Sequence, residues 1–430
     1  MKILIKMKKL VGGLKIFRYL LCLILVIFSN TLQSSQIFDY QSENFINKII
    51  SDVIAVNSYK KKIKYKIIKD EFPNAFVTED NTLFLTSGLF SYSPDYVSFL
   101  AVVAHEIGHI EKYHVSKRKK EIDNLKNVNS LGNMTAIFGS MILQQPNLIN
   151  AAIVNQTRVN NLYLNFSQEQ EIEADFYSIE TIKKLNLPTT SIKEFLVILE
   201  EKSKSHLNDN EMKKFSTHPL FSTRHDIIDN NALTNFKFNN ILDQEFNFIK
   251  AKFMAYTDNG FPEELDEDYK IYYDAIQFSK SGELLESLKN INFLITKYKD
   301  EIFLLETKAD ILLSYGYNIE ALKFYKKVLD KQPSNLYAQY NVLMNIDFRS
   351  ESFNFNENIF NDYQNLIYKF PNNKTILTRF YNLSKILNYD DWMIFFEVML
   401  FNKDSSNDIL FELKQTTKDN NLKKIIKLYN

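Results

Sequence analysis

Residues Leu100–His114 read LAVVAHEIGHIEKYH, and they place three of the six histidines of the chain within ten residues. The run Asp95–Leu125 contains no proline and is rich in apolar residues, which favours one long helix. In a helix, positions i and i+4 face the same way, so the imidazoles of His105 and His109 converge on one point. This stretch therefore predicts a helix that carries a pair of metal ligands.

The spacing His-Glu-x-x-His also places Glu106 beside the first histidine. Imidazole nitrogens bind Zn²⁺ at about 2.0–2.1 Å, and a neighbouring carboxylate can take a proton from zinc-bound water. A motif of five residues also arises by chance. Here, however, it lies in an apolar helix, where two histidines and a glutamate would be costly to bury without partners. A catalytic zinc centre is the favoured interpretation, and such a centre needs a third protein ligand.

The third ligand is expected in the stretch SQEQEIEADFYSIE, where Glu169, Glu171 and Glu173 compete. Glu171 and Asp175 are four residues apart, so on a helix they share a face, and one can bind the metal while the other orients a histidine. Helical spacing favours Glu171 without excluding the other two glutamates. The alternative interpretation of this stretch is a solvated acidic helix face.

His-Glu-x-x-His followed by Glu-x-x-Ala-Asp resembles the zinc metallopeptidases of the HtpX and CAAX-prenyl-protease type, in the gluzincin group. Two further stretches are similar to segments of that family, PNAFVTEDNTLFLTSGLF (residues 73–90) and STHPLFSTR (residues 216–224). The resemblance implies one Zn²⁺ per chain bound by His105, His109 and Glu171, with Glu106 as the general base. It gives Asp175 a supporting role beside the metal ligands.

The resemblance also implies that His218 and Arg224 lie near the metal. His218 is expected to stabilise the developing oxyanion or to cap the open zinc position, and Arg224 to orient His218. His114 falls where soluble, exported members of the family carry a further histidine. A surface or satisfied core histidine is the alternative for His114, so its role stays open at this point.

Two short segments read as strands, because KKIKYKIIKD and NTLFLTS alternate polar and apolar residues. The strand Thr82–Thr86 is expected to pair with an extended substrate through backbone hydrogen bonds, which would give low side-chain specificity. The predicted substrate-contacting residues are Asn74, Ala75, Phe76, Leu83, Phe84 and Leu85. The predicted fold class is therefore mainly α (α+β), with a gluzincin-type domain that contains a small β-sheet.

The N-terminal segment has the layout of a secretory signal peptide. Several basic residues precede the apolar run Tyr19–Phe28, which is too short to span a bilayer well, and a small polar segment follows. Cys22, in this segment, is the only cysteine of the chain. We predict export with a signal peptide at residues 1–35, no transmembrane span in the mature chain, and a periplasmic location, peripheral to a membrane at most. An uncleaved anchor is the alternative.

The C-terminal part shows an internal repeat of 34 residues. Ala275 and Gly282 recur as Ala309 and Gly316, where small residues let two helices approach and glycine permits the turn. The pattern resembles tetratricopeptide repeats; an ordinary helical bundle with a chance period is the alternative. We predict a metallopeptidase domain at residues 36–256 and a repeat domain at residues 257–430.

The net charge is zero, so the composition gives no reason to expect nucleic-acid binding. Export, a soluble protease domain and C-terminal repeats together resemble the periplasmic members of this family. The resemblance implies a periplasmic zinc endopeptidase that cleaves misfolded or assembly-stalled exported or outer-membrane proteins. The repeats would contact such clients or the outer-membrane assembly machinery. The alternative function is a chaperone or adaptor whose protease site is mostly latent.

Overall fold

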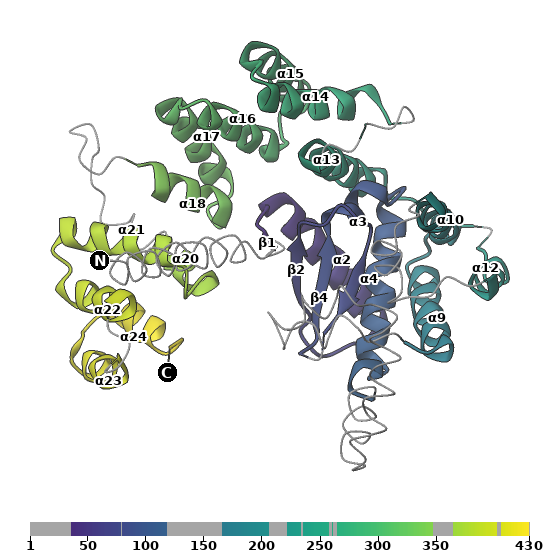
Figure 1. The fold of residues 1–430 in the computed structure, drawn as a ribbon, viewed down its shortest axis with the longest axis horizontal. Coiled ribbons are helices and arrows are strands. Elements are labelled where there is room, and N and C mark those ends of the chain that lie inside the picture. The colour runs from purple at the N-terminus through teal and green to yellow at the C-terminus, as the bar shows by residue number, and fades with distance from the viewer. Residues whose placement is uncertain are drawn as a thin grey trace, which may run out of the picture.

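The computed structural model describes residues 36–78, 80–117, 166–205, 222–233, 235–257, 260, 265–346, 364–401 and 406–429. The predicted signal segment and His218 lie outside these residues. The described chain is mainly helical with one small sheet, so the predicted mainly α (α+β) fold is confirmed (Figure 1). None of the described helices is both long and apolar enough to cross a bilayer.

The first half of the chain surrounds the sheet. Its elements are β1 (Gln36–Ile37), α2 (Tyr40–Asn57), β2 (Lys64–Ile68), β3 (Ala75–Val77), β4 (Thr82–Thr86), α3 (Ser87–Tyr92), α4 (Tyr96–Glu111), α9 (Gln168–Lys184), α10 (Thr190–Ser205), α12 (Ser222–Asp229) and α13 (Asn240–Thr257). Helix α4 runs through the core and contacts α2, α9, α10, α13 and β3. It is apolar on nearly all sides because it is buried on nearly all sides.

The sheet has the strand order β1-β2-β4-β3. Strand β4 is paired on both sides, parallel to β2 and antiparallel to β3, with Leu83, Phe84 and Leu85 opposite Val77, Phe76 and Ala75. The prediction that Thr82–Thr86 pairs with substrate is therefore wrong, because its backbone groups already bond within the sheet. Among the described strands, β3 is the edge on that side, and it carries Ala75 and Phe76.

Helices α4 and α9 meet closely at Gly108. A Cβ atom at this position would lie 3.1 Å from Cβ of Tyr177 on α9, so glycine permits the approach. Ser178 on α9 donates a hydrogen bond of 2.7 Å to the carbonyl oxygen of Ala101 on α4. Both helices start with a capping box, at Asp95 and Ser167. These contacts bring the acidic residues of α9 to the histidines of α4.

Helix α4 ends at Glu111, so the prediction of one continuous helix as far as Leu125 is wrong. Lys112 and Tyr113 form a turn, and Tyr113 has a left-handed φ of 59°. The helical conformation resumes for His114–Lys117. The left-handed residue ends the first helix and redirects the chain.

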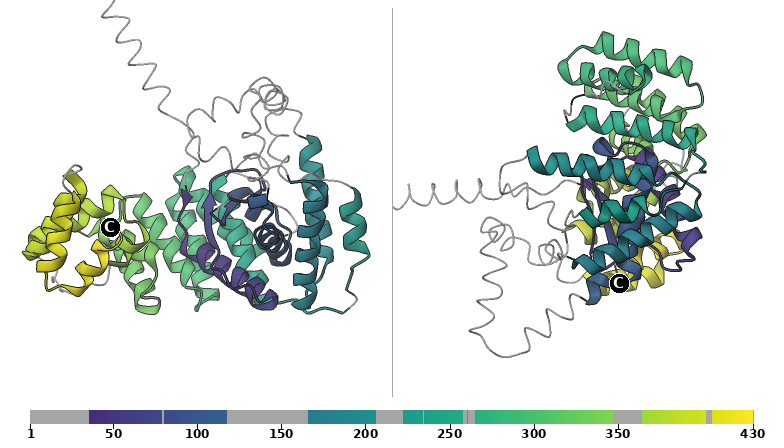
Figure 2. Two further views of the ribbon diagram at one scale, coloured as in Figure 1. Left: turned by 90° about the horizontal axis from the view of Figure 1, so that it is seen from below. Right: turned by 90° about the vertical axis from the view of Figure 1, so that its right-hand side faces the viewer.

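The second half consists of α14 (Glu267–Ser281), α15 (Leu284–Lys297), α16 (Ile302–Ser314), α17 (Asn318–Lys331), α18 (Leu336–Asn345), α20 (Gln364–Lys369), α21 (Lys374–Leu387), α22 (Asp390–Phe401), α23 (Ser406–Thr416) and α24 (Asn420–Ile426). These helices extend away from the sheet, and the last of them lie at the end of the molecule remote from α10 and α12 (Figures 1 and 2). Successive helices contact each other, as in a stack of hairpins.

The pairs α14–α15 and α16–α17 repeat the same burial at a spacing of 34 residues. Gly282 and Gly316 both have left-handed φ values, 92° and 80°, and turn the chain between the helices of each pair. Buried residues correspond in the same way: Ala275 with Ala309, Ser287 with Ala321, Ile291 with Tyr325, and Leu294 with Val328. The helical hairpins are thus observed, while their assignment as tetratricopeptide repeats and the boundary at residue 256 stay predictions.

The N-terminal segment of the first half contacts the second half. The ring of Phe38 packs against Phe370 at 5.1 Å between centroids, and Glu43 forms an ion pair of 3.2 Å with Lys369. Next to these contacts lies a largely buried polar group that we call the junction cluster. Lys252 and Glu306 are its buried members, and Asp39 and Asp310 are partly buried. Oδ1 of Asp39 accepts a hydrogen bond of 2.8 Å from Nζ of Lys252.

The pKa values of the three carboxyl groups in the junction cluster are shifted in different directions. Lys252 lowers the pKa of Asp39 against the effect of burial. Burial raises the pKa of Glu306 to about 8 and that of Asp310 to about 6, and the charge of Lys252 only partly offsets this. Asn335 donates to Glu306 at 2.9 Å, and the hydroxyl of Tyr337 contacts Asp310 at 2.9 Å.

Candidate metal centre

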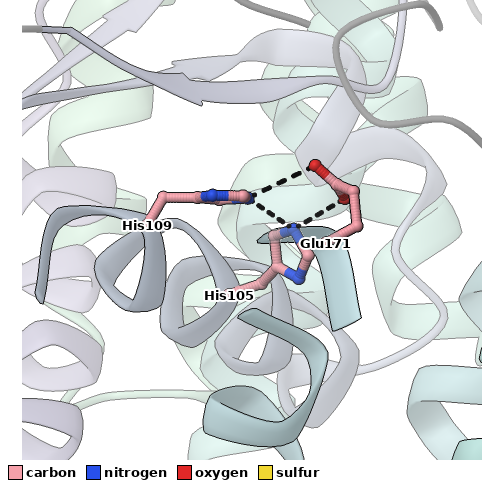
Figure 3. Close-up of side chains that lie close together, drawn as sticks. All are labelled: His105, His109 and Glu171. Atoms are coloured by element: carbon pink, nitrogen blue, oxygen red, sulfur yellow. Dashed lines mark hydrogen bonds and ion pairs between the residues drawn. The ribbon is translucent and has the colours of Figure 1, made fainter. Parts of the chain in front are cut away.

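His105, His109 and Glu171 face one another between α4 and α9 (Figure 3). The two histidines lie one turn apart on α4, and Glu171 is in the first turn of α9. All three side chains are buried. They are the only group of this kind that the described residues contain, and they are the three ligands expected from the sequence.

The spacing of the three donors fits a zinc ion. Nε2 of His105 lies 3.1 Å from Nε2 of His109 and 3.3 Å from Oε2 of Glu171, and the second histidine lies 3.5 Å from Oε1 of Glu171. Two ligands at about 2.0–2.2 Å from a tetrahedral metal are separated by about 3.3–3.6 Å. Two imidazoles and one carboxylate are also a ligand set of catalytic zinc sites. The residues present therefore fit Zn²⁺, which His105, His109 and Glu171 would hold.

His105 is supported by a buried ion pair. Its Nδ1 lies 3.0 Å from Oδ1 of Asp175, and Arg224 donates to the two oxygens of Asp175 from Nε at 2.7 Å and Nη2 at 2.6 Å. Burial alone would raise the pKa of Asp175, but Arg224 and His105 hold it below its usual value. Burial likewise opposes protonation of His105, yet hydrogen bonds that its imidazole donates to the carboxylates of Asp175 and Glu171 raise its pKa. The carboxylate of Asp175 is thus fixed in its charged form.

His109 is supported differently. Its ring stacks on Phe166 with 3.8 Å between centroids, and its Nδ1 lies 2.9 Å from Nδ1 of His114. The other ring nitrogen of His114, Nε2, lies 3.0 Å from Oε2 of Glu173. Burial lowers the pKa of His114, although the bond to Glu173 works against this, so the neutral imidazole is favoured. The hydrogen bond from His114 lowers the pKa of Glu173.

Glu106 is buried beside the ligands and lines a cavity of about 80 Å³. Asn74 and Ala75, at the edge strand β3, line the same cavity, as do Asp175 and Arg224. The remaining walls are mostly apolar, formed by Leu89, Ala101, Val102, Ile192, Phe195, Leu196 and Leu199. A carboxylate, a strand edge and an apolar pocket thus meet at the metal centre.

The structure separates the three competing glutamates. Glu171 lies at the metal centre, Glu169 is exposed, and Glu173 points instead to His114. Arg224 lies at the cavity as expected, but the partner that the described residues show for it is Asp175. Sequence reasoning missed the contact between His114 and Glu173, as well as the stacking of Phe166. His114 in the sequence was the available signal for the first of these contacts. No sequence pattern indicated the turn at Tyr113 that directs the side chain of His114 toward His109.

Comparison with known proteins supports the site. Residues 41–232 match Peptidase family M48, and all of the site residues named above lie in this range. The chain is 22% identical over 320 residues to a beta-barrel assembly-enhancing protease of Yersinia pestis, which covers 71% of this chain and 65% of that protein. It is 24% identical over 182 residues to the beta-barrel assembly-enhancing protease of Escherichia coli K12, 42% of this chain and 37% of that protein.

A third relative is the metalloprotease LoiP of Escherichia coli K12, 27% identical over 165 residues, which are 37% of this chain and 62% of that protein. The chain thus spans less than two thirds of the length of each of these curated relatives. The resemblance to zinc metallopeptidases that the motifs indicated is confirmed for the first half of the chain. These matches support a metalloprotease.

Proposed function

We propose that this chain is a zinc-dependent endopeptidase that binds one Zn²⁺ through His105, His109 and Glu171. The observation that carries the proposal is the convergence of two buried imidazole nitrogens, 3.1 Å apart, on the buried carboxylate of Glu171, whose oxygens lie 3.3 Å and 3.5 Å from them. The match of residues 41–232 to Peptidase family M48 supports the same conclusion.

Peptide hydrolysis needs a group that moves protons, and we assign this role to Glu106 because it is buried and lines the cavity beside the three proposed ligands. When bound, zinc supplies Lewis acidity at the scissile carbonyl and makes a water molecule acidic enough to be deprotonated near neutral pH. Glu106 takes that proton and later gives it to the leaving amine. Asp175 holds the ring of His105 in place, and Arg224 keeps Asp175 charged. We keep His218 as a proposed oxyanion-stabilising residue.

We place the substrate along β3. This strand is the open edge of the sheet in the described chain, and Asn74 and Ala75 line the cavity with Glu106. An extended peptide can add to such an edge through backbone hydrogen bonds, which select for unfolded chains rather than for sequence. The apolar walls of the cavity favour an apolar side chain next to the scissile bond.

The proposed setting is the periplasm, with residues 1–35 as a signal peptide. Two of the relatives are named beta-barrel assembly-enhancing proteases, which suggests misfolded or assembly-stalled outer-membrane proteins as substrates. The helical hairpins of the second half would contact such clients. Leu285 and Ile319 occupy equivalent positions 34 residues apart and are 81% and 70% exposed. This apolar pair favours a second candidate function, client binding by the repeats.

Glu106→Gln tests the proposed chemistry. The variant should keep its zinc but lose about 10²–10⁴-fold in kcat/KM on unfolded casein, because an amide cannot accept the proton. Zinc content is measured beside peptide release. Equal cleavage by the variant and the original protein rejects the proposed mechanism. If the original protein binds zinc, cleaves nothing and still promotes assembly of an outer-membrane client, the binding function is the correct one.

A further inference from the structure

Two residues next to His109 have no role in the proposed hydrolytic mechanism: His114, which contacts His109, and Glu173, which contacts His114. His114 is 1% exposed, and it joins Nδ1 of His109 to the carboxylate of Glu173. We propose that His114 and Glu173 form a positioning relay that holds His109 in the one tautomer able to bind the metal. The inference rests on the proposed zinc site and goes beyond it by naming what orients the second ligand.

The direction of each hydrogen bond follows from the group at the end of the relay. The carboxylate of Glu173 can only accept, so Nε2 of His114 must donate to it. A neutral imidazole that donates from one nitrogen accepts at the other, so Nδ1 of His114 accepts a hydrogen from Nδ1 of His109. The lone pair of His109 is then left on Nε2, the nitrogen that faces Glu171 at 3.5 Å.

The reverse arrangement would prevent metal binding. If Nδ1 of His114 donated, Nδ1 of His109 would accept, and the hydrogen of His109 would sit on Nε2. That nitrogen lies 3.1 Å from the other histidine ligand, in the space that the metal needs. The relay therefore selects between a binding and a non-binding tautomer of His109.

The backbone is shaped to make this contact. His114 follows His109 by five residues, one more than a helical turn allows, and the left-handed Tyr113 compensates for the difference. Stacking on Phe166 fixes the plane of the His109 ring, while the bond to His114 fixes which nitrogen faces the metal. The two contacts therefore restrict different degrees of freedom.

The relay ends at the surface. The side chain of Glu173 is 54% exposed, whereas Asp175, which supports His105, is buried and bound to Arg224. The two histidine ligands thus have different partners. His105 contacts the buried carboxylate of Asp175, whereas His109 contacts the imidazole of His114, whose own partner Glu173 is exposed to solvent. Loss of Glu173 should consequently matter less than loss of His114.

The experiment measures metal binding by the full-length protein rather than peptide hydrolysis. The Zn²⁺ dissociation constant is obtained by competition with a chromophoric chelator, and the visible spectrum of the Co²⁺-loaded protein reports ligand geometry. His114→Phe fills the space without an acceptor and should weaken Zn²⁺ binding about 10–100-fold, with an altered Co²⁺ spectrum. His114→Asn restores an acceptor near the position of Nδ1 and should recover most of the affinity.

Glu173→Ala should weaken binding about fivefold or less, since the residue is partly solvated. Glu169→Ala, an exposed glutamate one turn earlier on α9, is the matched control and should bind like the original protein. Thermal unfolding of the metal-free proteins checks that each variant is folded. Glu173→Ala lies at the surface and keeps the test valid if a His114 variant does not fold.

The outcomes separate the relay from the proposed function. If the original protein binds no Zn²⁺ at His105, His109 and Glu171, both the function and the relay are wrong. If it binds Zn²⁺ and folded His114→Phe has the same affinity and Co²⁺ spectrum, the relay alone is wrong. Equal weakening by His114→Phe and His114→Asn also overturns the relay, because the acceptor would then be irrelevant.

Discussion

The metal centre and the junction cluster are both groups of largely buried ionisable side chains, but the pKa values of their carboxyls are shifted differently. At the metal centre, Arg224 contacts both oxygens of Asp175 and holds the pKa of this carboxyl below its usual value. At the junction, Lys252 lowers the pKa of one carboxyl, that of Asp39, below its usual value. The pKa values of Glu306 and Asp310 rise to about 8 and about 6. Burial disfavours a charge unless a cation lies close by. Lys252 is a single cation beside three carboxyls, so its charge offsets the effect of burial on the pKa fully only for Asp39.

The difference suggests different uses. The carboxylate of Glu171 and a charged Asp175 beside neutral imidazoles suit a candidate centre for a divalent cation. With a pKa of about 8, Glu306 keeps its proton at neutral pH and bonds to Asn335 between the helices. Asp310, with a pKa of about 6, loses its proton at a lower pH and accepts a hydrogen bond from the hydroxyl of Tyr337. Substitutions in the two clusters should therefore have effects of different size and different pH dependence.

The largest effect is expected for Asp175→Ala. The guanidinium of Arg224 stays charged at any accessible pH and would lose the carboxylate that it contacts at two atoms. The free energy of unfolding of the metal-free protein should fall by about 3–5 kcal/mol, measured by urea denaturation. Asp226→Ala, an exposed aspartate on α12, is the control and should change it by about 0.5 kcal/mol or less. Equal effects of the two substitutions would contradict this assignment.

A smaller effect is expected for Lys252→Met at the junction. It removes the ammonium 2.8 Å from Asp39, but Asp39 can neutralise itself by taking up a proton, which Arg224 cannot do by losing one. The expected loss is about 2–3 kcal/mol at neutral pH. It should shrink as the pH falls toward about 4, where protonated Asp39 needs no cation. Exposed Lys326→Met is the control; a loss that stays constant with pH would contradict the prediction.

The smallest effect, and the most specific one, is expected for Glu306→Gln. The pKa of Glu306 is about 8 in the folded protein against an ordinary value of 4.5, so between these values the folded state keeps a proton that the unfolded state releases. The contribution of Glu306 to stability is complete below about pH 4.5 and is lost as the pH rises through about 8. Glutamine cannot ionise, so the variant should lose less stability than the original protein between about pH 5 and 8.

Urea denaturation at several pH values measures this slope. Asp310→Asn is the matched comparison, since the pKa of Asp310 is about 6 against an ordinary value of 3.8. The Asp310→Asn substitution should therefore remove the pH dependence of stability over a lower pH range than Glu306→Gln does. Unchanged pH dependence in both variants would show that the two carboxyls are ionised in the folded protein, and the contrast between the clusters would fail.

The metal centre was largely predictable because its information is local. His105, Glu106 and His109 lie within five residues on one helix, and the spacing of Glu171 and Asp175 fixes a second helical face. Helical spacing favoured Glu171 over Glu173 without excluding it, and the resemblance to the zinc metallopeptidases implied the same ligand. The relay was not predictable, because it depends on the left-handed conformation of Tyr113, a residue type that rarely marks such a turn.

The predicted substrate strand shows the same limit. Alternation of polar and apolar residues located the strand Thr82–Thr86 correctly but could not state its neighbours. Pairing of β4 with both β2 and β3 was decided by long-range contacts, and it moves the open edge to Ala75–Val77. Strand order is a property of the assembled sheet, so no local pattern encodes it.

The sequence by itself indicated the mainly helical fold, the candidate ligands, the proposed general base and the 34-residue period of the second half. The period and the pairing of His105 with His109 follow from spacing along a helix or helix pair, and the resemblance to the metallopeptidases supplied Glu171 and the role of Glu106. Only the tertiary structure decided the edge strand, the bond of His114 to His109 and the junction cluster. The junction cluster joins Asp39 to Lys252, which lies 213 residues later in the chain, and to Glu306, which lies further on still. No periodicity in the sequence relates these residues. Their protonation depends on burial and on the distance to a cation, and both exist only after the two halves have packed.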